Sequence, residues 1–180
     1  MAVTVREAGD DDLQAVLGVH RRAFGGSDEA DLVAALLDDP TARPLLSLLA
    51  EIDGEVTGHV LFTAVTVDRS TGSDRGSLLA PLAVVPGHQR LGIGATLMEA
   101  GFDRLRAAGV RLVFVLGHPD YYPRHGFAPA GRLGFEAPYP IADENADAWM
   151  VQALRPGLIG AVSGRVVCCD TMDKPEVWRE

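Results

Sequence analysis

A segment in the middle of the chain combines glycines, a proline and polar side chains at the spacing of an anion-binding turn. An apolar strand, a turn and a helix start follow one another in Leu82-Ala83-Val84-Val85-Pro86-Gly87-His88-Gln89-Arg90-Leu91-Gly92-Ile93-Gly94-Ala95. The first N–H groups of a helix have no partner within the helix, and glycine lets a phosphate approach them without a Cβ in the way. The negative charge also meets the positive end of the helix dipole. We therefore expect an anionic ligand at the helix that begins near Gly92.

The glycine spacing separates this segment from two common nucleotide-binding motifs. A dinucleotide-binding turn needs a third glycine where this chain has Leu97, and no suitable acidic residue follows the next strand. The Gly-Lys-Ser or Gly-Lys-Thr sequence of a P-loop occurs nowhere in the chain. These absences disfavour a nicotinamide cofactor and a nucleoside triphosphate. Tight packing of helix on sheet through Gly92 and Gly94 stays open as the structural alternative.

The spacing Gln89-x-x-Gly92-x-Gly94 after a Val-x-Pro strand end resembles the acyl-CoA pyrophosphate loop of the GCN5-related N-acetyltransferases, the GNAT family. The resemblance covers the middle third of the chain and continues, in the family's order, to the Tyr-x-x-x-Gly-Phe element at Tyr122 to Phe127. Leu116 to Tyr122 reads Leu-Gly-His-Pro-Asp-Tyr-Tyr. It looks like the subgroup of uncharacterised bacterial acetyltransferases with a Leu-Gly-x-Pro-x-Tyr-Tyr motif.

The resemblance implies an α/β (α+β) fold with a central mixed, mostly antiparallel sheet of six to seven strands flanked by helices and splayed before the CoA loop. It also implies that acetyl-CoA donates an acetyl group to a small-molecule or peptide amine by direct attack in a ternary complex. A non-catalytic acyl-CoA-binding or regulatory module is the alternative. The donor-binding residues it implies are Leu82, Ala83, Val84, Gln89, Arg90, Leu91, Gly92, Ile93, Gly94, Ala95 and Thr96.

One position departs from the family pattern. Many members have Arg or Lys directly before the first loop glycine, where this chain has Leu91. We therefore expect one cationic phosphate contact to be missing. Arg90 is a partial replacement, and backbone N–H groups supply most of the recognition.

Tyr122 lies four residues before Gly126, the position that matches the family's general acid. A phenol there can protonate the departing thiolate, while a backbone N–H near Leu82 polarises the thioester carbonyl. The alternative is that Tyr122 only packs near CoA. His118 and Asp120 are candidate general bases, with turn and helix-cap roles as their alternatives. By analogy with the family layout, residues 25–27 and 139–140 border the acceptor pocket.

The hydrophobic periodicity predicts the elements that must hold these residues. Strands are expected at 3–6, 45–52, 55–67, 78–85, 111–116, 149–154 and 162–168, and the polar stretch from Asp68 to Ser77 is expected to be a loop. Helices are expected from the acidic run at 10–12 to Phe24, with His20 on the apolar face, then from about 28, at 91–108 and briefly near 121–124. Pro81 lacks the N–H that a central strand uses, so this strand is expected to lose a partner there.

Length and composition limit the remaining possibilities. The 180 residues fit one domain, 1–180, with an acyl-CoA-binding core at about 78–127 and C-terminal strands at about 148–170. A formal net charge of −9 disfavours nucleic acid and anionic lipid as partners. The two cysteines, Cys168 and Cys169, are adjacent and the histidines lack a metal-ligand spacing, so we expect no metal and a cytoplasmic protein. No apolar run is long enough to span a membrane, and a homodimer through the late strands remains open.

Overall fold

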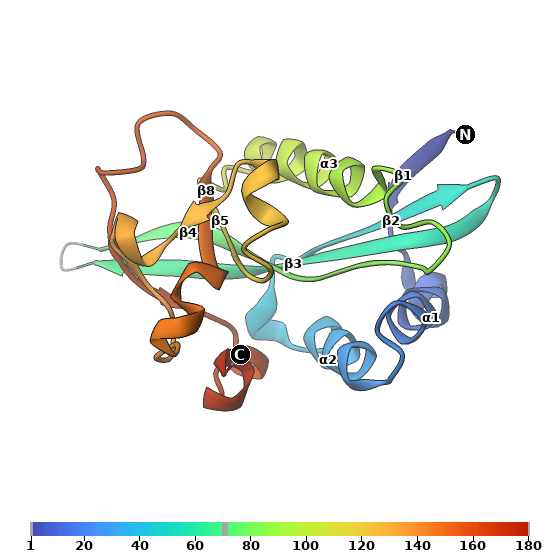
Figure 1. Cartoon of the computed structure of the whole chain (residues 1–180), viewed down its shortest axis with the longest axis horizontal. Helices are drawn as coiled ribbons and strands as arrows, with labels where there is room; N and C mark the ends of the chain where they lie inside the picture. Colours follow the sequence, from blue (N-terminus) through green and yellow to red (C-terminus); the bar gives the residue numbers. More distant parts are fainter. Residues whose placement is uncertain (1, 70–71, 180) are drawn as a thin grey trace.

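The computed structural model describes residues 2–69 and 72–179, which form one mixed sheet with helices on both faces (Figure 1). The α-helices are α1 (Leu13–Phe24), α2 (Asp28–Leu37) and α3 (Ile93–Ala107). The strands are β1 (Val3–Glu7), β2 (Leu46–Ile52), β3 (Glu55–Arg69), β4 (Gly72–Val84), β5 (Leu112–Leu116), β6 (Ala128–Pro129), β7 (Phe135–Glu136), β8 (Trp149–Ala153) and β9 (Gly164–Val167). Short 3-10 helices include η1 (Asp10–Asp12), η2 (Pro40–Ala42), η3 (Tyr122–His125), η4 (Gly131–Leu133), η5 (Asp143–Ala148), η6 (Asp170–Met172) and η7 (Pro175–Trp178).

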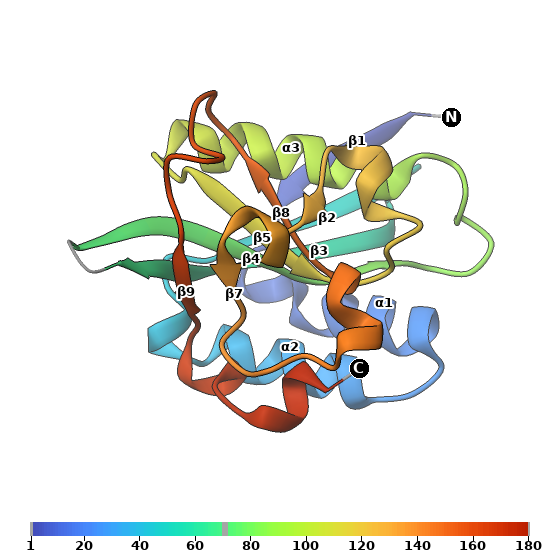
Figure 2. The same cartoon turned by 60° about the vertical axis from the view of Figure 1, so that its left-hand side comes forward.

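The sheet has the order β1-β2-β3-β4-β5-β8-β6, and β9 joins it beside β3 and β7 (Figure 2). All pairs are antiparallel except β4 with β5 and β7 with β9. The seven strands of the main path agree with the predicted six to seven, and short β7 and β9 form a branch. The mostly antiparallel, helix-flanked sheet is therefore confirmed.

Two apolar layers hold the helices on the sheet. Helix α3 covers one face, while α1, α2 and the C-terminal segment cover the other (Figure 1). On the α3 face, Leu97 and Met98 are fully buried in one cluster with Phe62 of β3. On the opposite face, Leu36 of α2 and Trp178 of η7 belong to a second cluster. Among the helices of the described ranges, none combines the length and apolarity that crossing a bilayer takes.

Strand β4 loses regular pairing at Pro81, as the sequence predicts. On the β3 side, Ala80 and Pro81 stand opposite Leu61 alone, which makes a β-bulge. On the β5 side, the parallel pairing ends at Leu78 and Phe114. The last residues of β4 therefore have no hydrogen-bonded strand on the β5 side, and the sheet is splayed there.

The polar stretch from Asp68 to Ser77 is mostly strand, so the prediction of a loop there is wrong. Strands β3 and β4 stay paired out to Arg69 and Gly72, and residues 70–71 of the predicted loop lie outside the described residues. Asp74 accepts ion pairs from Arg69 at 3.0 Å and from Arg111 at 2.7 Å. These contacts satisfy a buried carboxylate, which explains how a polar sequence continues a strand.

Helix α1 ends at Phe24 as predicted, but its apolar face is narrower than the periodicity suggests. Leu13 and Phe24 are 41% and 46% exposed, whereas His20 is fully buried. His20 Nε2 lies 2.8 Å from Nδ1 of His59, whose Nε2 lies 2.8 Å from Oγ of Ser47. Burial lowers the pKa of His20 to about 4 and the pKa of His59 to about 3. Two neutral imidazoles thus join α1 to β3 and β2.

Candidate active site

The loop between β4 and α3 presents free backbone donors at the start of the helix. Gly92 precedes α3 with φ of 81°, a conformation that favours glycine. The first intrahelical bond runs from the Thr96 N–H to the Gly92 carbonyl at 3.0 Å. The N–H groups of Ile93, Gly94 and Ala95 therefore have no acceptor within the helix and are available to an anion.

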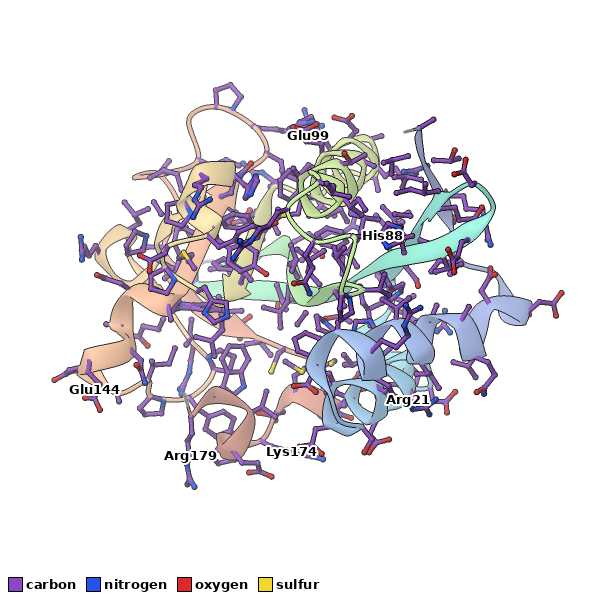
Figure 3. All side chains as sticks on the ribbon, turned by 45° about the vertical axis from the view of Figure 1, so that its right-hand side comes forward. Arg21, His88, Glu99, Glu144, Lys174 and Arg179 are labelled. Atoms are coloured by element: carbon purple, nitrogen blue, oxygen red, sulfur yellow. The ribbon has the colours of Figure 1, made fainter. Side chains whose placement is uncertain are left out.

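The residues that carry these N–H groups line a cavity of about 570 Å³, which we call the cradle cavity. Its wall comes from the β4–α3 loop, the first turn of α3 and η3. The lining residues are Val84, His88, Gln89, Arg90, Gly92, Ile93, Gly94, Ala95, Tyr121, Arg124 and His125. Figure 3 shows His88 on the loop that leads to α3.

The cradle cavity has more basic side chains than the sequence predicts. Arg124 and His125 of η3 join Arg90 on its wall, whereas Leu91 is 48% exposed and does not line it. Sequence reasoning missed Arg124 and His125 because they follow the loop by some thirty residues. Their place inside the Tyr-x-x-x-Gly-Phe element is the signal that could have identified them. Arg124, which comes from a second segment of the chain, thus offsets the cation that is missing at Leu91.

The other predicted donor-binding residues are distributed around the end of β4. Gln89 donates from Nε2 to the Val84 carbonyl at 3.0 Å, and Thr96 donates from Oγ1 to the Gly92 carbonyl at 2.9 Å. These bonds hold the loop and the helix start in place. Ala83 is buried in a cluster with Val19 of α1, so its side chain supports the strand. Leu82 lines a different cavity.

Tyr121 and Tyr122 face different cavities although they are adjacent in sequence. Tyr121 lines the cradle cavity, and a Cβ at Gly94 would lie 2.6 Å from its hydroxyl oxygen. Tyr122 lines the second cavity and packs so closely on Gly117 that a Cβ there would clash with its ring. The two rings meet edge to face with centroids 5.0 Å apart. Because Tyr121 covers Gly94, glycine at that position serves the wall of the cradle as well as the approach of an anion.

The second cavity, of about 470 Å³, passes through the splay between β4 and β5, and we call it the through-sheet cavity. On the α3 side its wall includes Tyr122 and Leu79. On the opposite side its wall comes from α1, α2 and the C-terminal segment. The full lining is Phe24, Glu29, Leu32, Leu78, Leu79, Ala80, Pro81, Leu82, Val115, Leu116, Gly117, His118, Pro119, Tyr122, Asn145, Ala148, Met172, Val177 and Trp178.

Tyr122 is the phenol of the through-sheet cavity. Its side chain is 8% exposed, and burial raises the pKa of the phenol well above its usual range, with a smaller contribution from Tyr121. The hydroxyl is therefore fully protonated at neutral pH. A neutral phenol at the splay is a proton donor facing the end of β4.

The two candidate bases occupy different places. His118 lines the through-sheet cavity, whereas Asp120 is exposed and lines neither cavity. The Asp120 carbonyl accepts a bond from Nε of Arg124 at 3.0 Å, so this residue helps to position a cation of the cradle. The geometry favours His118 over Asp120.

Two predicted borders of the acceptor pocket lie elsewhere. Residues 25–27 are flanked by Phe24 and Glu29, which line the through-sheet cavity while 25–27 do not. Tyr139 and Pro140 line a separate cavity near β7.

No three His, Cys, Asp or Glu side chains within residues 2–69 and 72–179 are grouped closely enough to hold a metal ion. Burial raises the pKa of Cys168 to about 12, which leaves this thiol unreactive.

Known proteins share both the sequence and the arrangement of these elements. Residues 13–135 match the family model of the acetyltransferase (GNAT) family. An uncharacterized N-acetyltransferase of Escherichia coli, YjhQ, is 50% identical over 153 residues, which cover 84% of each chain.

Two solved structures extend the comparison to the fold. The GNAT family N-acetyltransferase YhbS from Escherichia coli, in complex with CoA, superposes with a TM-score of 0.84 at 28% identity, covering 96% of this chain and 92% of that one. A GNAT family acetyltransferase from Brucella melitensis, in complex with acetyl-CoA, superposes with a TM-score of 0.73 at 27% identity, covering 96% and 99%. The chain therefore belongs to the GNAT family of acetyltransferases.

Proposed function

We propose that the protein transfers the acetyl group of acetyl-CoA to a primary amine by direct attack in a ternary complex. One observation carries the proposal: the end of β4 runs from the through-sheet cavity at Leu82 to the cradle cavity at Val84. A phosphate-bearing donor can therefore lie along one free strand edge, with its two ends in two chemically different cavities. The complexes of YhbS with CoA and of the Brucella melitensis enzyme with acetyl-CoA support this assignment.

The cradle cavity fits the pyrophosphate of the donor. The N–H groups of Ile93, Gly94 and Ala95 supply uncharged donors, and Arg90 and Arg124 supply positive charge. The unpaired edge near Leu82, Ala83 and Val84 offers backbone groups to the pantetheine amides. A backbone N–H near Leu82 polarises the thioester carbonyl.

The through-sheet cavity fits the reaction itself. The amine nitrogen forms a bond to the carbonyl carbon, the carbon–sulfur bond breaks, and the sulfur receives a proton from the Tyr122 hydroxyl. The nitrogen loses its extra proton to become the amide, and this proton, passed through solvent, restores the Tyr122 phenol. The ammonium form of the acceptor must first lose a proton, for which His118 is the imidazole on the cavity wall. Because burial raises the pKa of Tyr122, its hydroxyl keeps its proton until negative charge develops on the departing sulfur.

The net charge and the two thiols support a proposal about the partners and the cellular location of the protein. A net charge of −9 argues against nucleic acid as a partner, and the described cysteines, Cys168 and Cys169, are unpaired. We assign the protein to the reducing cytoplasm.

Thermal melting with acetyl-CoA tests the donor first. A ligand that binds only the folded state raises the melting temperature with concentration. A rise followed by amine-dependent release of CoA supports the enzyme, and a rise without release of CoA for any amine favours a binding module. No rise at millimolar acetyl-CoA contradicts the proposal.

A further inference from the structure

The side of the through-sheet cavity that faces away from α3 has its own chemistry. We call this part the acceptor mouth; it consists of Phe24, Glu29, Leu32, Met172, Val177 and Trp178. Five of these six side chains are apolar. Because the cradle cavity lies at the start of α3, on the other side of the sheet, the acceptor mouth is the route left for the second substrate. An apolar wall selects an apolar body.

Glu29 is the exception in the acceptor mouth. It lies in the first turn of α2, is half-buried, and is the one residue with a formal charge on the described wall of the through-sheet cavity. Among the described residues no hydrogen bond or ion pair engages its side chain. A carboxylate beside apolar side chains attracts a cation strongly, since the surroundings screen the charge poorly. One ammonium group therefore finds a partner here.

A second ammonium group on the same acceptor has no carboxylate to pair with on the described wall of the cavity. The described polar side chains that remain on the cavity wall are His118, Asn145 and Tyr122. None of these carries a negative charge at neutral pH. The C-terminal segment carries surface charges of both signs, and none of them lines the cavity: Lys174 and Arg179 (Figure 3) together with Asp170, Asp173 and Glu176. Placing an additional cation against Leu32 or Met172 would cost its hydration without an ion pair in return. The cavity therefore discriminates against polycations.

The apolar wall is held in place rather than loosely attached. The carboxylate of Asp39 accepts bonds from the Thr171 N–H at 2.9 Å and from the Thr171 hydroxyl at 2.7 Å. Trp178 donates from Nε1 to the Met172 carbonyl at 2.9 Å and packs edge-on against Trp149. These bonds fix the C-terminal segment against the sheet, so the acceptor mouth is formed before the substrate binds.

We propose that the acceptor is a small primary amine with a single ammonium group on an apolar aliphatic or aromatic body. Glu29 is the positioning residue that holds the ammonium while the body packs on Phe24, Leu32 and the C-terminal segment. The volume of about 470 Å³ is shared with the acetyl end of the donor, which limits the acceptor to a small molecule. This inference rests on the proposed function and narrows it to one class of substrate.

A panel of amines tests the substrate class by release of CoA from acetyl-CoA. Phenethylamine, tryptamine and hexylamine represent apolar monoamines, spermidine and kanamycin represent polycations, and a peptide with a free N-terminus represents proteins. We expect kcat/KM to be about 100-fold higher for the best apolar monoamine than for spermidine or kanamycin, because the second cation is left unpaired. Equal or better use of a polycation or the peptide overturns the inference and leaves the N-acetyltransferase intact. No release with any amine, despite a melting shift with acetyl-CoA, overturns both.

Variants of Glu29 test its role separately. Glu29→Gln should raise KM for phenethylamine about tenfold with little change in kcat or in KM for acetyl-CoA, and Glu29→Asp should restore part of the loss. Calorimetric titration of phenethylamine into the protein should show the same weakening without turnover. Asp31→Asn, an exposed change in the same helix, is the matched control. An unchanged KM in Glu29→Gln, or an equal rise in Asp31→Asn, contradicts the positioning role.

Discussion

The cradle cavity and the acceptor mouth, which we propose as the two ends of one substrate path, have opposite chemistry. The cradle cavity is lined by residues from two segments, 84–95 and 121–125, and presents backbone N–H groups, arginines and histidines. The acceptor mouth draws on α1, α2 and the C-terminal segment, and presents apolar side chains around Glu29. The splay at Pro81 connects the two.

The difference indicates how a protein with a net negative charge can bind both an anionic donor and a cationic acceptor. The net charge of −9 opposes an anionic donor at long range, so binding depends on cations and N–H groups concentrated at one helix start. At the acceptor mouth, we propose that a single carboxylate, Glu29, on an apolar wall is sufficient for a monocation. Each substrate is thus recognised by local groups rather than by the overall charge.

The largest effect should come from blocking the cradle cavity. Gly92→Glu places a side chain on a backbone with φ of 81° and a negative charge beside the expected phosphates, so acetyl-CoA binding should weaken by at least about 100-fold. Melting shifts with acetyl-CoA measure this. Gly131→Glu, at an exposed position with open space around it, should keep the wild-type shift. Normal affinity in Gly92→Glu would remove the pyrophosphate assignment.

A change at the splay should separate chemistry from binding. Tyr122→Phe removes the proton donor and keeps the packing, so kcat should fall about 100-fold while KM for acetyl-CoA stays the same. Tyr121→Phe, the matched variant in the cradle cavity, should change KM for acetyl-CoA more than kcat. If steady-state kinetics show unchanged kcat for Tyr122→Phe, Tyr122 is a packing residue.

The acceptor side should be the part of the fold that is sensitive to acid. His20 stacks on Phe24 and bonds His59, and the pKa values of the two imidazoles, about 4 and about 3, lie below the ordinary 6.5. The unfolded chain therefore binds more protons below pH 6.5, so stability is complete above that pH and falls as the pH decreases toward 4. From pH 7 to pH 5 we expect a loss of about 2 kcal/mol for each imidazole, on the order of 4 kcal/mol in all, measured by denaturant unfolding.

The two buried imidazoles, rather than the carboxylates, should account for this acid sensitivity. The pKa values of Asp12 and Asp39 are lowered by hydrogen bonds, to Arg6 for Asp12 and to Thr41 and Thr171 for Asp39, so these carboxylates titrate below the pH window. An NMR titration that places both buried imidazoles near pH 6.5 would contradict the assignment.

A smaller effect should follow from removing one cation of the cradle cavity. Arg124→Ala should raise KM for acetyl-CoA about tenfold and weaken the salt dependence of binding, because Arg90 and the backbone donors remain. Arg132→Ala, an exposed arginine outside the cradle cavity, is the control. An unchanged KM for Arg124→Ala would show that the cradle relies on backbone groups alone.

The sequence predicted the parts of the molecule that depend on neighbouring residues. The splay at Pro81, the helix start at Gly92 and the limits of α1 at Phe24 follow from missing N–H groups, glycine conformations and hydrophobic period. The loop predicted at Asp68 to Ser77 is wrong because Asp74 finds Arg111, a partner far along the chain. The place of Arg124 in the cradle cavity was missed for the same reason.

The sequence alone predicted the family, the sheet with its splayed strand, and a loop that presents donors to an anion, since these depend on short-range backbone geometry. Only the tertiary structure decided which side chains meet at the acceptor mouth. Phe24 and Glu29 are near each other in sequence, but most of the chain separates them from Trp178, and no local pattern relates Trp178 to them. Their proximity results from the packing of α2 and the C-terminal segment on one face of the sheet, where Asp39 anchors Thr171.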